Sequence, residues 1–477
     1  MPMPSCPLAI YNAFPRDFPS IKDLINYIPN IRKMEMDIVW VNPFTNCDIN
    51  KTVSVRKDKI NNKPYTMVNS IYACNDLDSF SWPGNNNSLE IEVIQDLCQA
   101  IINNKMIPMF DLVLNHVGFL GKFHIENQEL FNTKLPDKNF QDVIKFDYFS
   151  HDMSKEKLKQ ILNKWYSYIE FMYKLGFQAV RIDAIKHLSV GIQEKIIQYI
   201  NSLDKNMIIF GELLFDKGFD VNQLAVELGN IKYSCITNSI YYQEKDDIKH
   251  LNTEMGIKRQ LTNLGTIGFT GNHDELPLSA KTYQEYFGYK LNYLVNDYEN
   301  NEPYKNLLEF MRRKIAIVAL CSGGGYYILS GDEIGSPYPK SVFSLQKDLY
   351  DNKKSPFHNL YPVPPFQSSP PTFNMANFIT NLNKVRKSLS NTQNSPFFYY
   401  EFKSYPENYK IFKIIRYNKK NGSNYTNSSA DIILVLTFDN PKETLSKYLR
   451  QWLLEDIKCE NRKCFLLSEL KGEQIEL

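Results

Sequence analysis

Apolar runs of strand length alternate along the chain with segments in which apolar residues recur every three or four positions. Helical spacing is clear at Ile21, Leu24, Ile25, Ile28 and Ile31, and again from Leu158 to Met172. This alternation predicts a parallel sheet covered by helices. The runs that predict strands are Pro7–Phe14, Met36–Phe44, Met106–His116, Phe177–Asp183, Met207–Leu213, Lys232–Ile240, Gly265–Asp274 and Gly323–Glu333. Eight strand–helix units over about 390 residues predict a (β/α)₈ TIM barrel with its active site at the carboxyl ends of the strands.

Long connections and a change of pattern suggest how the chain divides into domains. Residues 117–151, between the third predicted strand and its helix, are expected to form a short excursion domain. A helix at Thr372–Ser390 closes the barrel, which is then built from residues 1–116 and 152–392. Beyond it, runs such as "KIFKIIRY" and "DIILVLTF" alternate as strands do. Residues 393–477 are therefore expected to form a small C-terminal β-rich domain.

Composition narrows the class of protein. The 477 residues are 43% hydrophobic and 23% charged with a net charge of +2, which gives no reason to expect nucleic acid or a membrane surface as partner. The longest clean apolar run, Ile315 to Cys321, is too short to cross a bilayer. The N-terminal residues lack the basic and apolar regions of a secretory signal. The eight cysteines are scattered along the chain, which indicates reduced thiols and no disulfide framework. We therefore expect a cytoplasmic protein, whose oligomeric state the sequence leaves open.

Polar residues occur where several predicted strands end. The third strand ends in "DLVLNH", the fourth in "VRID", the fifth at Glu212 and the seventh in "GNHD". Charged groups buried in a barrel are costly unless they pair or serve a ligand. We therefore expect the carboxylates of Asp183, Glu212 and Asp274 to meet at one mouth of the barrel, near His116 and His273.

The surroundings of Asp183 and Glu212 predict different protonation states. Arg181 lies two residues before Asp183 on a strand, so both side chains point to one side and the cation favours the ionised carboxylate. Glu212 ends an apolar run, so desolvation should raise its pKa towards that of a general acid. Retaining glycosidases use such a nucleophile and acid/base pair about 5 Å apart. Asp183 is therefore the expected nucleophile and Glu212 the expected acid/base.

Four segments carry a resemblance to a known family. "DLVLNH", "GFQAVRIDAIKH", "FGEL" and "FTGNHD", in this order and spacing, resemble the four conserved regions of the α-amylase family, glycoside hydrolase family 13. The resemblance covers residues 5–390 and includes "GGGYYILSGDEIG", which is similar to that family's eighth strand and following loop. It implies a hydrolase or glucanotransferase that acts on α-glucan or malto-oligosaccharide through a covalent glycosyl-enzyme intermediate.

The same resemblance implies roles for individual residues. Asp183 would be the nucleophile, Glu212 the acid/base, and Asp274 the carboxylate that holds the 2- and 3-hydroxyls of the distorted sugar. Tyr72 would stack on that sugar. The substrate-binding residues that the resemblance implies are Tyr72, His116, Arg181, Lys186, His187 and His273, of which Arg181 would orient Asp183 and the "KH" pair would touch the leaving-group sugars.

The sequence says less about cofactors and about the acceptor of the glycosyl group, which is water in a hydrolase and a sugar in a transferase. The chemistry needs no cofactor, and residues 117–151 hold few acids, which argues against the calcium ion that the family often holds beside the position of Asn115. "NHDEL" is more like members that isomerise or transfer glucosyl units, whereas "IDAIKH" is more like hydrolases and maltosyl transferases. A trehalose synthase-like isomerase or a maltosyl transferase therefore stays open beside a hydrolase.

Two other classes of function are also compatible with these residues. One is a barrel that binds carbohydrate or a protein partner without catalysis. The other is a metal-dependent lyase that uses His116, Glu212 and His273. A chelator would inactivate the lyase, whereas the glycosidase does not require a metal.

Overall fold

The computed structural model describes most of the first 213 residues and selected segments beyond them. The described ranges are 8–47, 52–57, 64–68, 70–83, 87–131, 133–138, 140–146, 148, 154–213, 228, 231–237, 265–273, 278, 308, 311–312, 314–316, 318–319, 322, 324–336, 344–345, 375–390, 398–405, 408–418, 430–436, 463–468 and 471–475. Only the backbone is described at 52–57, 64–68, 265–266, 344–345, 385, 388–390 and beyond 397. Within these ranges, no helix is both long enough and apolar enough to cross a lipid bilayer.

Eight parallel strands close into a barrel, which confirms the predicted TIM-barrel fold. In chain order they are β1 (Leu8–Ala13), β2 (Ile38–Val41), β7 (Ile107–Leu112), β10 (Ala179–Ile182), β11 (Ile208–Gly211), β12 (Cys235–Thr237), β13 (Gly265–Phe269) and β14 (Gly325–Leu329). Each pairs with its neighbour in the chain order of the barrel, and β14 closes the ring on β1. The observed strands are shorter than the apolar runs that predicted them.

The barrel interior changes from apolar to polar towards the carboxyl ends of several strands. The apolar side chains that fill it are Leu8, Ile10, Ile38, Trp40, Ile107, Met109, Ala179, Ile208, Phe210, Cys235, Ile267, Phe269 and Tyr327. Successive side chains of a strand point to opposite faces, so inward positions recur every two residues. Ile208 and Phe210 face inward on β11, and Glu212 continues the same side. Glu212 therefore lies at the mouth of the barrel because it is two residues after the inward-facing Phe210.

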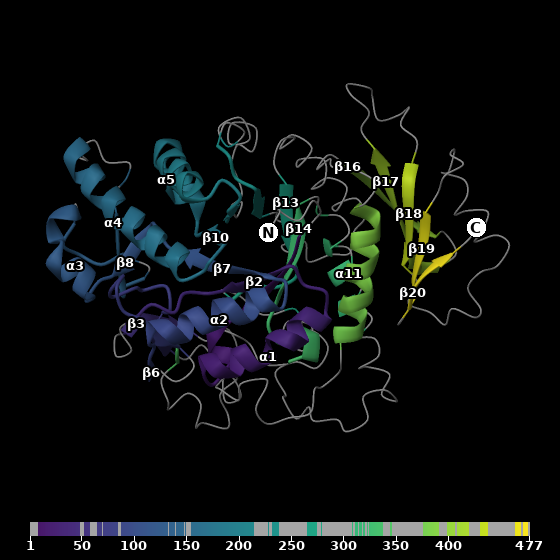
Figure 1. Ribbon diagram of the computed structural model, residues 1–477, viewed down its shortest axis with the longest axis horizontal. Helices are drawn as coiled ribbons and strands as arrows, with labels where there is room; N and C mark the ends of the chain where they lie inside the picture. The colour runs from purple at the N-terminus through teal and green to yellow at the C-terminus, as the bar shows by residue number, and fades with distance from the viewer. Residues whose placement is uncertain are drawn as a thin grey trace.

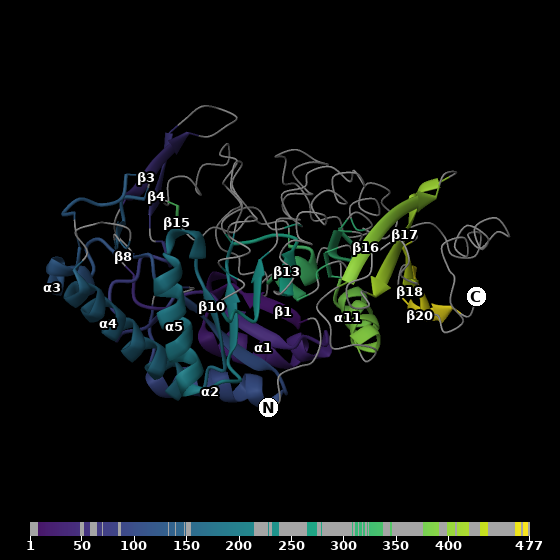
Figure 2. The same ribbon diagram turned by 90° about the horizontal axis from the view of Figure 1, so that it is seen from above.

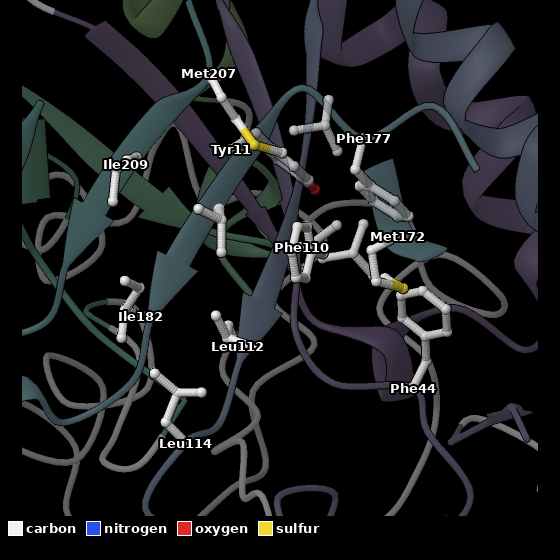
Figure 3. Packing of buried hydrophobic residues seen from close by; sticks show 14 of the residues in the cluster. Tyr11, Phe44, Phe110, Leu112, Leu114, Met172, Phe177, Ile182, Met207 and Ile209 are labelled. Atoms are coloured by element: carbon white, nitrogen blue, oxygen red, sulfur yellow. The ribbon is translucent and has the colours of Figure 1, made fainter. Parts of the chain in front are cut away.

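The outward faces of the strands pack against a layer of helices. Figure 3 shows outward side chains of the barrel strands, such as Phe110, Leu112 and Ile182, packed in a cluster that also holds Met172 and Phe177. The covering helices are α1 (Ile21–Lys33), α2 (Ile91–Asn103), α4 (Lys155–Lys174) and α5 (Val190–Leu203), which lie side by side in the pairs α1–α2 and α4–α5 (Figures 1 and 2). This hydrophobic layer holds the ring of strands in place.

Local sequence determines where these helices begin. Ser20 forms a capping box with Asp23: its Oγ accepts the Asp23 backbone N–H at 3.3 Å, and its own backbone N–H donates to Asp23 Oδ2 at 2.8 Å. Ser154 caps α4 by accepting the Lys157 backbone N–H at 3.1 Å.

The connections carry small elements of their own. Residues after β2 and β14 contribute β3 (Thr52–Lys57), β4 (Pro64–Val68) and β15 (Ser344–Leu345), which form one antiparallel sheet. The region after β7 holds β8 (His116–Gly118), α3 (Lys122–Glu126), η2 (Gln128–Leu130) and β9 (Val143–Lys145). The other short elements are η1 (Pro15–Asp17), β5 (Ser81–Trp82), β6 (Asn87–Ser88), η3 (Ile185–His187) and η6 (Asp332–Ile334).

A five-stranded sheet follows the barrel, as the change of pattern predicted. Its order is β16 (Phe398–Tyr405), β17 (Asn408–Asn418), β18 (Ala430–Leu436), β19 (Lys463–Ser468) and β20 (Lys471–Ile475). Helix α11 (Ala376–Ser390) lies between this sheet and barrel strands β13 and β14 (Figures 1 and 2). The domain boundaries at 116, 151 and 392 remain predictions.

Candidate active site

Arg181 lies at the centre of a carboxylate cluster at the carboxyl end of the barrel. It is fully buried and stands in register with Asp111 on the neighbouring strand β7. Its Nη1 lies 2.7 Å from Asp111 Oδ1 and 2.7 Å from Asp183 Oδ1, and its Nη2 contacts Glu212 Oε1. One guanidinium therefore joins carboxylates from three adjacent strands. Its planar fork of donors suits this triple contact, which the point charge of a lysine would not.

The Tyr72 hydroxyl forms a second junction beside this cluster. It lies 2.7 Å from Asp111 Oδ2, 2.7 Å from His273 Nε2 and 3.0 Å from Asn42 Nδ2. The Tyr72 ring also stacks on the His273 imidazole, with centroids 5.3 Å apart and an interplanar angle of 10°. Tyr72 lies in the 70–83 connection, Asn42 follows β2 and His273 follows β13. Segments far apart in the sequence thus meet over Asp111.

The chain makes a constrained turn directly after Asp183. Ala184 has φ 41° and ψ 54°, a left-handed conformation that costs a residue with a Cβ about 1–2 kcal/mol. Its N–H donates to Glu212 Oε2 at 3.0 Å, and Asn115 Nδ2 donates to the carbonyl of Asp183 at 3.1 Å. Strain of this kind persists only where the surroundings enforce it, and it concentrates at functional sites. Here the turn brings the two carboxyl groups to opposite ends of one guanidinium.

The electrostatics of the cluster favour retained protons. Burial raises the pKa of Glu212, and the Arg181 cation opposes this shift while the Asp183 carboxylate adds to it. Burial likewise raises the pKa of Asp111 against the opposing effect of Arg181. Burial and then the Arg181 charge lower the pKa of His273 well below its usual value. At neutral pH the His273 imidazole is therefore uncharged.

The remaining predicted residues lie around this cluster or outside the described part. His116 is partly buried on β8, opposite Lys145, and its ring forms a hydrogen bond with the Tyr72 backbone. Burial, followed by the charge of Lys145, lowers the His116 pKa to about 4. Lys186 and His187 lie on η3, just after the strained turn, partly buried and exposed respectively. Asp274 lies outside the described residues, which end at His273 in this segment.

The structure adds four residues that the sequence-based set lacks. Asp111 accepts from Arg181 and Tyr72, Trp40 donates its indole N–H to Asp111 Oδ2 at 3.3 Å, and Asn12 donates to Asn42 Oδ1 at 2.8 Å. All four are buried and polar or amphipathic. The alternation of side chains along β1 and β2 places Asn12, Trp40 and Asn42 on the side that faces the barrel interior. This alternation is the sequence signal that could have identified them.

The resemblance connects a calcium ion with the position of Asn115, whose side-chain oxygen would be one ligand. Asn115 Oδ1 is buried and makes no hydrogen bond. Ca²⁺, however, takes six to eight oxygen ligands. No group of three or more His, Cys, Asp or Glu side chains suited to a metal occurs in the part of the chain that is described. The described residues alone therefore do not make a calcium site.

Comparison with known proteins places the fold. No family model and no curated protein matches the chain. Similar solved structures include an α-amylase from Lactobacillus plantarum, with a TM-score of 0.60 and 14% identity over 86% of each chain. Another is the cyclic α-maltosyl-(1→6)-maltose hydrolase from Arthrobacter globiformis, with a TM-score of 0.56 and 11% identity over 88% of this chain and 90% of that one. A third is a trehalose-6-phosphate hydrolase variant from Bacillus licheniformis, with a TM-score of 0.54 and 11% identity over 87% and 90%. The chain thus has the fold of these glycoside hydrolases.

Proposed function

We propose that this protein belongs to the α-amylase family and is a retaining enzyme that hydrolyses or transfers α-glucosidic bonds of α-glucans or malto-oligosaccharides. One observation carries the proposal: Asp183 and Glu212, from adjacent barrel strands, contact the two terminal nitrogens of the same Arg181. This closeness is compatible with the about 5 Å separation of retaining enzymes. The likeness in fold to solved hydrolases of maltosyl and trehalose-phosphate compounds supports the same substrate class.

The two carboxyl groups would divide the reaction between them. Asp183, bound to the Arg181 cation, attacks the anomeric carbon as the bond to the leaving oxygen breaks. Glu212 gives its proton to that oxygen, which suits a carboxyl group whose pKa burial has raised. Glu212 then takes a proton from water or from a sugar hydroxyl, which displaces Asp183 and releases the product with retained configuration. Asp274 would hold the substrate hydroxyls, and no step requires a metal or an organic cofactor.

Two substitutions test the division of roles. Asp183→Asn should abolish turnover of maltoheptaose and of aryl α-glucosides, because both need the nucleophile. Glu212→Gln should depress maltoheptaose turnover by about 10²–10⁴-fold, and aryl glucosides much less, since a good leaving group needs little protonation. Asp96→Asn, on the exposed face of α2, is the matched control and should keep full activity. Substantial turnover by Asp183→Asn would contradict the proposal.

Product analysis separates the finer alternatives. Chromatography after incubation with maltoheptaose would show only shorter sugars for a hydrolase and also longer ones for a glucanotransferase or maltosyl transferase. Conversion of maltose to trehalose would indicate an isomerase. NMR of the first product should show the α-anomer. Oligosaccharide binding in calorimetry without any product would favour a non-catalytic barrel, and inactivation by a chelator would favour the lyase.

A further inference from the structure

The chain just beyond β11 is held by a side chain of the neighbouring strand β12. The backbone ladder between the two strands ends with the pair Gly211 and Ile236. Two residues after Gly211, the Thr237 hydroxyl lies 2.7 Å from the backbone nitrogen of Leu213 and 2.7 Å from its carbonyl oxygen. A hydroxyl has one hydrogen, so it accepts the Leu213 N–H and donates to the Leu213 carbonyl. One side chain thus takes over where the ladder stops.

Burial makes this contact important for the backbone of Leu213. Leu213 is fully buried, and Thr237 is buried on the side of β12 that faces the barrel interior, two residues after Cys235. Buried backbone groups are costly to leave without a hydrogen bond. The Thr237 hydroxyl satisfies both groups of Leu213 and thereby keeps this residue next to β12.

The same peptide plane is held from its other edge by β10 and the turn that follows it. The Glu212 N–H donates to the Ile182 carbonyl at 2.9 Å, and the Glu212 carbonyl accepts the Ile185 N–H at 3.0 Å. The Glu212 carbonyl and the Leu213 N–H belong to one planar peptide unit. Ile185 therefore binds one edge of this plane and Thr237 the other, so the plane cannot rotate without breaking a buried hydrogen bond.

We propose that Thr237 is a positioning residue for Glu212. By holding the peptide plane between Glu212 and Leu213, it keeps the Glu212 carboxyl group where it can reach the oxygen of the leaving group. A general acid must come within hydrogen-bond distance of the atom that it protonates, so a small rotation at this plane reduces proton transfer. The catalytic consequence rests on the proposed function, whereas the hold on Leu213 follows from the two hydrogen bonds. The Thr237 hydroxyl hydrogen is directed to Leu213, and Thr237 acts only through Glu212.

The experiment compares two substrates in Thr237→Val, which keeps the shape of the side chain but removes the hydroxyl. We expect kcat on maltoheptaose to fall by about 10- to 100-fold, the scale of a misplaced catalytic group, with a smaller change in KM. Turnover of an aryl α-glucoside should fall much less, because a good leaving group needs little protonation. Thr237→Ser keeps the hydroxyl and should restore most of the kcat on maltoheptaose.

A matched control and a second variant make the result decisive. Thr380→Val in α11 removes a hydroxyl that donates to the Ala376 and Lys33 carbonyls and should leave the ratio of the two rates unchanged. If Thr237→Val does not fold, Thr237→Cys replaces it, because a thiol is only a weak donor and acceptor, and the ratio should shift in the same direction. Equal losses on both substrates would indicate a structural role alone. That result, or full kcat on maltoheptaose in the folded variant, would overturn the proposal.

Hydrogen exchange of the Leu213 amide, measured by mass spectrometry with fragment-ion resolution, tests the hold without any substrate. The amide should exchange faster in Thr237→Val than in the unsubstituted protein, and Thr237→Ser should exchange slowly again. Unchanged exchange would refute the hold on Leu213 even in an active enzyme. Faster exchange in a protein whose unsubstituted form acts on no α-glucoside would instead remove the proposed function and leave the hold on Leu213 standing.

Discussion

Replacing Arg181 by leucine tests the electrostatic centre of the site. The substitution removes the guanidinium but leaves Asp111, Asp183 and Glu212 in place, all buried or nearly so. Removing one partner of a buried ion pair costs about 3–5 kcal/mol, because the remaining charge has no compensation. Leucine keeps part of the packing over Trp40, whose ring centroid lies 5.0 Å from the guanidinium carbon. We therefore expect the free energy of unfolding at pH 7 to fall by about 3–5 kcal/mol.

Urea titration followed by tryptophan fluorescence measures this loss, and the pH dependence identifies its cause. Burial already raises the folded-state pKa values of Asp111 and Glu212, and without the opposing Arg181 cation they rise further above their unfolded values. Such groups stabilise the fold below the unfolded pKa and lose that contribution as the pH rises through the folded pKa. The loss should thus be smaller at pH 5 than at pH 7. Arg32→Leu, at a helix end where the side chain donates to the Met36 carbonyl, should cost only about 0.5–1.5 kcal/mol at both pH values. Equal losses for the two variants, or a loss independent of pH, would refute the reasoning.

Three further outcomes are expected. Tyr72→Phe keeps the ring stack on His273 but removes the hydroxyl that lies between Asp111, His273 and Asn42. Urea titration should show that the free energy of unfolding falls by about 1–3 kcal/mol. An unchanged free energy would mean that these groups find other partners. Turnover of maltoheptaose should fall as the pH rises through the pKa of Glu212, which burial raises. This decrease at high pH should be absent from the residual aryl glucosidase activity of Glu212→Gln. A decrease that survives the substitution would belong to another group. Gly325→Ala should lower Tm, because the Gly325 φ is +126° and a Cβ would meet the Leu8 backbone where β14 closes on β1. The control Gly191→Ala, in α5, places its Cβ in open space and should stabilise the fold by roughly 0.5–1 kcal/mol. A Gly325→Ala protein with unchanged Tm would contradict the required backbone geometry.

The period of the apolar residues was enough to predict the barrel, because each strand must bury both faces and each helix only one. It was less accurate about where strands end. The run Met106–His116 reads as one strand, yet the ladder with β10 stops at Leu112, and the chain turns so that His116 pairs with Lys145 instead. Apolar character continues past that point because Leu114 packs in the outer core. Hydrophobicity reports burial, and burial continues where the hydrogen-bonded ladder does not.

The site was predictable where one strand carries the signal and not where distant segments combine. Arg181 and Asp183 lie two residues apart, so their contact follows from the alternation of side chains. Asn42 and His273 are 231 positions apart in the sequence, and only the closed ring of strands brings them within 3.1 Å. Asn42 therefore had no local signature beyond its inward parity after Trp40.

The hydrogen bonds to the carboxyl groups of the cluster act against the burial that raises their pKa values. One guanidinium charge cannot balance three buried carboxylates, and burial raises the pKa of both Asp111 and Glu212. Asp111 Oδ2 accepts from both Tyr72 and Trp40, and its Oδ1 accepts from Arg181. Glu212 accepts one backbone N–H and contacts Arg181, which leaves it more room for a hydrogen. Hydrogen bonds donated to a carboxylate favour its ionised form. The Tyr72 and Trp40 bonds therefore act against the burial that raises the pKa of Asp111, and fewer donors act in this way on Glu212, the group that the proposed reaction needs as its acid.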